Sequence, residues 1–333
     1  GAALSDAAAG AIADASGISG GDGGDEIANT AKISAQATSD VDTTAVTVTL
    51  SVSKEGVSGG AALSDTSSSA LSAARGIDGG AGNDRIWNEG VTEATSNAFA
   101  DTTSVVVQVA GSLYGAAGGV SMSDSSAASL AKSTGILGGA GDDVIVNSSQ
   151  VAARSAADVH ATSVSVTVSG SIGLAAGAAF SDASVDSRAE SRGLDGGDGS
   201  DVIVNTGEVV SVAGATGKST SVSVNVALGA GGGATFSDSS ALVSADATGI
   251  DGGAGHDRIV NTGPITANAA SDADVSSVSV TVGAAVSAGA SFGDASVVSN
   301  TAARGIAGGE GNDKIYNEGK ITSGAMSRVD ADS

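Results

Sequence analysis

A six-residue block, Gly-Gly-x-Gly-x-Asp, occurs six times in this chain at nearly constant spacing. The aspartates that end the copies are Asp25, Asp84, Asp143, Asp201, Asp257 and Asp313. Self-similarity at a fixed period is the signature of an array in which each repeat stacks on its neighbours. We therefore expect one repeat array over residues 1–333. The expected repeats are approximately 1–59, 60–118, 119–176, 177–232, 233–288 and 289–333, the last incomplete.

Two further columns accompany every copy of the block. An isoleucine lies two residues after each block aspartate, and we expect it to pin the turn to the core: Ile27, Ile86, Ile145, Ile203, Ile259 and Ile315. An asparagine lies four residues after it: Asn29, Asn88, Asn147, Asn205, Asn261 and Asn317. Asparagines in register favour a stacked amide ladder or a tight turn over a direct metal role.

The segments between the blocks have the pattern of β-strands. Runs such as Val164-Ser165-Val166-Thr167-Val168 alternate with a period of two. No capped segment of helical length has a 3.6-residue period, and we interpret the Ala-rich residues 7–15 as extended. Although 41% of residues are apolar, only 2% are aromatic. The interior must therefore be thin and built from small β-branched and methyl side chains.

Landmark spacing predicts the size of one coil. Each repeat divides into three strand-bearing segments of about 19 residues, close to the roughly 18–22 residues of a common β-solenoid coil. We therefore predict an all-β, repetitive β-solenoid of the parallel β-helix or β-roll type, with about three coils per 56–59-residue repeat. The whole chain would form about 17 coils and a rod of roughly 80 Å. Other stacked β architectures remain open, whereas separate β-sandwich modules of this size could scarcely bury enough surface.

Charge and composition exclude several classes of function. The chain has 14 Lys and Arg against 37 Asp and Glu, a net charge of −23, and no cysteine. Nucleic-acid binding and anionic lipid surfaces call for basic clusters, so neither is expected. No apolar run is long enough to insert into a membrane as a helix. The two histidines, His160 and His256, lie at non-equivalent positions, and no catalytic motif interrupts the repetition, so we expect no enzyme.

The block resembles the calcium-binding nonapeptide of RTX proteins, as in Gly252-Gly253-Ala254-Gly255-His256-Asp257-Arg258-Ile259-Val260. The resemblance implies that turn carbonyls and the aspartate bind Ca²⁺, about one ion per repeat, since Ca²⁺ takes six to eight oxygen ligands. The implied metal-site residues, besides the six block aspartates, are Gly20, Gly21, Gly23, Gly79, Gly80, Gly82, Gly138, Gly139, Gly141, Gly196, Gly197, Gly199, Gly252, Gly253, Gly255, Gly308, Gly309 and Gly311. RTX arrays repeat the block every nine residues, whereas here it stands alone in each repeat.

A second aspartate column offers a substitute for the missing neighbouring turn. These residues lie 19 positions before each block aspartate: Asp6, Asp65, Asp124, Asp182, Asp238 and Asp294. If one coil has about 19 residues, each would lie one coil below its block and could complete or orient the calcium shell. The alternatives are that this column forms Asx-type turns, and that the block itself is a plain turn without metal.

These features predict a calcium-stabilised extracellular structural rod. Such rods resemble segments of large secreted or cell-surface bacterial proteins, including adhesins, surface layers and fibres. We expect homo-assembly, end to end or lateral, with the cell surface or a polysaccharide as further partners. The alternatives are the non-catalytic stalk of a secreted β-helix enzyme, such as a polysaccharide lyase or epimerase, and a carbohydrate- or ice-binding solenoid.

Overall fold

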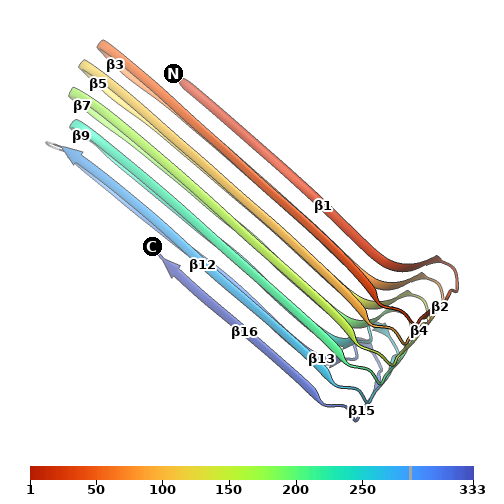
Figure 1. Ribbon diagram of the computed structural model, residues 1–333. Coiled ribbons are helices and arrows are strands. Elements are labelled where there is room, and N and C mark those ends of the chain that lie inside the picture. Colours follow the sequence, from red (N-terminus) through yellow and green to blue (C-terminus); the bar gives the residue numbers. More distant parts are fainter. Residues whose placement is uncertain (285–286) are drawn as a thin grey trace.

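The computed structural model describes residues 1–284 and 287–333, which form strands and turns and no helix (Figure 1). The all-β, parallel solenoid predicted from the sequence is confirmed. Since the described residues include no helix, none of them forms a helix that could cross a membrane. The strands are β1 (Ala2–Asp22), β2 (Glu26–Asn29), β3 (Ile33–Ala81), β4 (Arg85–Asn88), β5 (Thr92–Ala140), β6 (Val144–Asn147), β7 (Val151–Asp198), β8 (Val202–Asn205), β9 (Val209–Asp251), β10 (Ala254–Gly255), β11 (Arg258–Asn261), β12 (Ile265–Ala284), β13 (Ser287–Ala307), β14 (Glu310–Gly311), β15 (Lys314–Asn317) and β16 (Ile321–Asp332).

Each of the long strands β3, β5, β7 and β9 runs outward and then folds back on itself. The two halves of β5 contact each other, because the Ser123 hydroxyl donates to the Ser104 carbonyl oxygen (3.0 Å). Figure 1 shows these strands turning at the end of the molecule that lies opposite the short strands. We call the first half of each the outward arm and the second half the return arm; β1 and β13 are return arms, and β12 and β16 are outward arms.

The strand register shows that one repeat forms one coil. Strand β3 pairs in parallel with β5 from Ile33 opposite Thr92 to Ala81 opposite Ala140, so each residue pairs with its counterpart one whole repeat later. The prediction of three coils per repeat, and with it the long rod of many narrow coils, is therefore wrong. The three segments expected in each repeat belong to the two arms of one flat coil, and a four-residue strand closes each coil. The product is a slab about 70 Å long along the arms and about 25 Å along the stack, at ordinary strand dimensions.

The block end of the slab holds a compact aliphatic core. In each inner coil the return arm, the short strand and the next outward arm each contribute one fully buried side chain, as Ile136, Ile145 and Val151 do. These residues stack in columns through the coils. The expectation that the isoleucine after each block fastens the turn to the core is confirmed for the inner coils, because Ile86, Ile145, Ile203 and Ile259 are all fully buried.

Between the two arms the interior is filled mainly by alanine, serine and threonine. Ser163 reaches across to donate to both the carbonyl oxygen and the hydroxyl oxygen of Ser123, each at 2.8 Å. A serine hydroxyl can span the gap only if the two sheets lie much closer than the roughly 10 Å of ordinary stacked sheets. The interior is thin, as predicted, and Val106 is fully buried in it, but most valines of the Val-rich runs lie outside. In Val46–Leu50, Thr47 and Thr49 are buried, whereas Val46 and Val48 are exposed on the outside.

Changes in repeat length fall at the turn between the arms. The register shifts between Ser112 and Ala116, and again between Gly170 and Leu174, as coils of different length stack. A sheet can absorb an inserted or deleted residue at such an irregularity without moving the rest of the ladder.

Candidate metal centre: the glycine–aspartate turns

The block forms the turn that joins each return arm to its short strand. Its second and third glycines have left-handed backbone angles, for example φ +108° at Gly80 and +125° at Gly82. Only glycine adopts this conformation at little cost. The turns also stack closely, so that a Cβ on Gly80 would collide with the carbonyl oxygen of Gly21 in the neighbouring coil. Two separate requirements therefore specify glycine here, and neither depends on a metal.

Blocks from successive repeats lie directly on one another. Gly21 pairs with Gly80, Gly80 with Gly139, and Gly139 with Gly197. Because one repeat is one coil, the neighbouring turn that seemed to be missing from each repeat is present in the adjacent coil. The six blocks thus form one continuous column of turns at the edge of the slab.

The block aspartates form a buried ladder within this column. The backbone N–H of each aspartate donates to Oδ1 of the aspartate in the next coil, at 2.6–3.0 Å in all five steps. The four inner residues, Asp84, Asp143, Asp201 and Asp257, are only 1–2% exposed. The block aspartates thus form a chain of backbone-to-carboxylate hydrogen bonds along the stack.

The second carboxylate oxygen of these aspartates has no partner. Within the described chain, Oδ2 is buried without a hydrogen bond in Asp25, Asp84, Asp143, Asp201 and Asp257. In each of these five blocks, Oδ2 lies beside the glycine that begins the block. A Cβ added to that glycine would collide with Oδ2 and also with the carbonyl oxygen of the corresponding glycine in the next coil. Two acceptors therefore face the same side of that glycine. Such an arrangement calls for a proton or a cation, because a buried charge without a partner is costly.

The electrostatics of the ladder agree with this need. Burial raises the pKa of Asp143 to about 6 and that of Asp201 to about 7, and neighbouring block carboxylates add to both shifts. The hydrogen bond from the backbone opposes the shift in each case. Burial likewise raises the pKa of Asp257. Asp143, Asp201 and Asp257 are therefore harder to ionise than a free aspartate unless a positive charge is close by.

The donor set fits a cation in part. Each turn offers one orphan carboxylate oxygen and several glycine carbonyl oxygens, which are the hard ligands that Ca²⁺ prefers. The described residues contain no group of three or more His, Cys, Asp or Glu side chains that could hold a metal ion. Any shell of six to eight oxygens would therefore consist mainly of backbone carbonyls and water.

The second aspartate column does not take part in this site. Asp6 pairs with Asp65 in the middle of the return arms, and Asp65 with Asp124. Asp6 and Asp25 are separated by most of β1, or roughly 50 Å of extended chain. The prediction that Asp6, Asp65, Asp124, Asp182, Asp238 and Asp294 complete the calcium shell is wrong, because it assumed that one narrow coil separates each of them from its block. The alternative of an Asx-type turn is also wrong, since the column lies within strands.

This column instead borders a shallow groove of about 650 Å³ on the outer face of the return arms. An apolar column lies beside the aspartates: Leu4, Leu63, Met122, Phe180, Phe236 and Phe292. The rings of Phe180 and Phe236 stack with centroids 5.2 Å apart, and those of Phe236 and Phe292 do the same. Burial raises the pKa of Asp182 to about 6, with a further contribution from Asp124 and Asp238.

The asparagine column closes the turn after each short strand. Asn205 Nδ2 donates to Oδ1 of Asn261 (2.7 Å) and to the carbonyl oxygen of Gly207 (2.9 Å). Asn147 Nδ2 in turn donates to Oδ1 of Asn205 (2.7 Å). The predicted amide ladder is thus confirmed, and the amide groups of these side chains form hydrogen bonds with one another and with the turn backbone.

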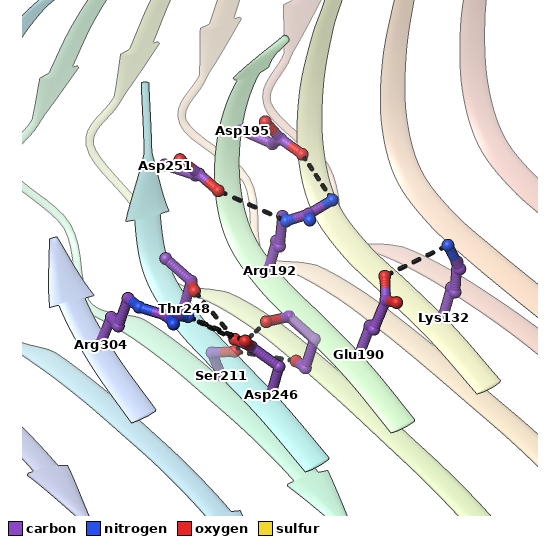
Figure 2. A network of polar contacts seen from close by, with 10 residues as sticks. Lys132, Glu190, Arg192, Asp195, Ser211, Asp246, Thr248, Asp251 and Arg304 are labelled. Carbon is purple, nitrogen blue, oxygen red and sulfur yellow. Dashed lines mark hydrogen bonds and ion pairs between the residues drawn. The ribbon is translucent and has the colours of Figure 1, made fainter. Parts of the chain in front are cut away.

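One polar network near the blocks was not predicted from the sequence. Figure 2 shows Arg192 between two acidic groups, with contacts of 3.4 Å to Asp195 and 3.5 Å to Asp251, and Lys132 beside Glu190 at 3.2 Å. Burial raises the pKa of Asp195 to about 6, although Arg192 opposes the shift. The sequence does place residues of opposite charge one repeat apart, as in Lys132 and Glu190. This spacing predicts an ion pair only if one repeat is known to form one coil.

Comparison with known proteins gives no relative from which a function could be taken. No family model matches the sequence, and no curated protein is significantly similar to it. A solved structure described as the Streptococcus pneumoniae surface protein and adhesin PfbA aligns over 82% of this chain and 69% of that chain, with 9% identity and a TM-score of 0.06. That score is too low to indicate a common fold, so the alignment carries no argument.

Proposed function

We propose that this chain is a calcium-stabilised structural segment of an extracellular or cell-surface protein, and that copies of it self-associate, end to end or laterally. The observation that carries the proposal is the column of buried block aspartates whose Oδ2 atoms lack partners. Ca²⁺ held between these oxygens and the glycine carbonyls would neutralise the column and join successive coils. Extracellular Ca²⁺ is abundant enough to fill weak sites of this kind.

A structural role is supported by how the repeated residues are used. The invariant glycines, asparagines and isoleucines form turns, ladders and core columns, all of which serve the stacking of coils.

A carbohydrate-binding role has less support. Sugar platforms need exposed aromatic faces, whereas the faces of Phe180, Phe236 and Phe292 are turned toward one another. The groove beside them offers ring edges and carboxylates. The structural proposal is therefore the better supported of the two.

Calcium binding is tested by equilibrium dialysis together with thermal unfolding in calcium and in chelator. We expect about one Ca²⁺ per repeat and a higher melting temperature with calcium. The double variant D143N/D201N should bind fewer ions and lose much of the calcium-dependent gain in melting temperature. The matched control D182N/D238N removes the same charge from the outer column and should keep both.

Two outcomes would contradict the proposal. Identical melting curves with calcium and with chelator would show that the ion does not stabilise the fold. A loss of bound calcium in D182N/D238N, with none in D143N/D201N, would place the ions on the outer column and leave the turns as plain glycine turns.

A further inference from the structure

The outer surface of the outward arms carries an apolar face that covers no other part of the described chain. It consists of three columns in five successive coils, which we call the valine face: Val46, Val105, Val164, Val222 and Val278; Val48, Val107, Val166, Val224 and Val280; and Leu50, Val109, Val168, Val226 and Val282. In the first coil these side chains are 60–69% exposed, and in the fifth 41–48%. In the inner coils each is half-buried.

The valine face is uncharged well beyond its three columns. On one side it is followed by Thr44, Thr103, Thr162, Thr220 and Ser276, and on the other by Val52, Gly111, Gly170, Leu228 and Ala284. Charged groups begin beyond these flanking columns, at Asp42, Asp101, Lys218 and Asp274 on the first side, where His160 completes the series, and at Lys54 on the second side. In the sixth coil, Asp332 follows Ser276. A flat apolar centre with a charged rim is the anatomy of a protein–protein interface.

We propose that two copies of this chain pack together through their valine faces. The inference rests on the lateral self-association in the proposed function, gives it a surface, and needs no calcium. Two negatively charged chains repel each other, so a contact between them must lie where neither carries charge. The valine face meets this condition. It is also regular, with side chains about 4.8 Å apart across the coils and about 6.7 Å apart along the arms. One face can therefore set its valines into the gaps of an identical face, as in a dry steric zipper.

The available area agrees with a stable dimer. Five uncharged columns over five coils cover roughly 30 Å by 24 Å, or about 700 Å² per copy at standard strand spacing. Two copies would bury about 1,400 Å², which lies within the size range of specific stable interfaces.

Sedimentation equilibrium over a range of concentrations tests this proposal. We expect the wild-type chain to form at least a dimer in both calcium and chelator. The variant V107K/V224K sets two ammonium groups in the centre of the face, on coils that are not adjacent, and should raise the dissociation constant at least about 100-fold. The control V120K/V298K adds the same charge to exposed valines of the return arms and should dimerise as the wild type does. Circular dichroism should show that both variants keep their strands.

The same measurement separates face packing from end-to-end association. A two-fold contact closes at two copies, whereas end-to-end association continues to larger masses. A wild-type chain that stays monomeric, or a V107K/V224K variant that dimerises like the control, would overturn the inference. Neither result would affect the calcium measurement, so the two proposals can fail independently.

Discussion

Replacement of Asp201 with asparagine tests whether the buried ladder is electrostatically strained when no cation is bound. Asp201 is 1% exposed, and its Oδ1 accepts the backbone N–H of Asp143 (2.8 Å). Asparagine keeps that acceptor and replaces the orphan Oδ2 with an NH₂ donor. The donor would face the Gly252 carbonyl oxygen, since both lie on the same side of Gly196. In chelator at pH 8, we therefore expect D201N to be more stable than the wild type.

The raised pKa sets the size and sign of the effect. Burial raises the pKa of Asp201 from 3.8 to about 7. A carboxyl group whose pKa is higher in the folded state destabilises the fold as it ionises, so the cost is absent below about pH 4 and complete above about pH 7. A shift of one pKa unit is worth about 1.4 kcal/mol of folding free energy. Because neighbouring carboxylates share the cost and water screens part of it, we expect D201N to gain about 2 to 4 kcal/mol at pH 8 and little at pH 4.

Urea unfolding in chelator at pH 4 and pH 8 measures this difference. The control D198N removes a charge from an exposed position three residues away in the same turn, and its stability should change little at either pH. In saturating calcium the order should reverse, because the asparagine cannot supply a charged ligand. A D201N variant that is less stable than the wild type at pH 8 in chelator would refute the argument that the ladder is strained.

Three further predictions concern the architecture and can be measured by the same unfolding assay. Gly253→Ala should cost at least about 2 kcal/mol, since φ is +98° and the new methyl would meet the Gly197 carbonyl oxygen, whereas Gly214→Ala, with open space around it, should be nearly neutral. Ser163→Val should destabilise by about 1 to 3 kcal/mol more than Ser163→Ala, because its larger side chain would crowd the two Ser123 oxygens that lie 2.8 Å from the Ser163 hydroxyl; equal losses would show that the gap can widen. Asn205→Ala should cost about 2 to 4 kcal/mol by leaving an amide on each neighbouring coil without its partner, and a neutral result would argue against the ladder.

The columns closest to the block could be predicted from the sequence because they are local. The glycines, Ile145 and Asn147 lie close together in the chain, and the turn chemistry of this stretch decides their roles. The coil size could not be obtained in the same way. Residues 19 positions apart do meet, as Ser104 and Ser123 show, but they meet across a fold-back rather than through successive coils. A constant spacing indicates that two residues lie close together. It does not show whether the chain between them completes a coil or folds back on itself.

The side of the sheet that the valine side chains face could not be predicted for a different reason. Alternation in Val164–Val168 establishes that the two sets of side chains face opposite sides, and the usual assumption is that the apolar set faces inward. Here the distance between the sheets favours small side chains on the inside, because one serine hydroxyl spans the gap, although Val106 and Gln108 are also buried there. That distance depends on the whole column of Ala, Ser and Thr residues across the repeats, which no single segment reveals.

Because one repeat forms one coil, the width of the slab along the arms and its thickness along the stack are set independently. The length of each repeat fixes how far the slab extends sideways, and the number of repeats fixes its thickness, at about 4.8 Å for every repeat. Duplication or loss of a whole repeat would therefore make a thicker or thinner plate of unchanged outline. Each additional repeat therefore lengthens the stack very little for the number of residues it contains. Such a chain is better suited to covering an area than to bridging a distance.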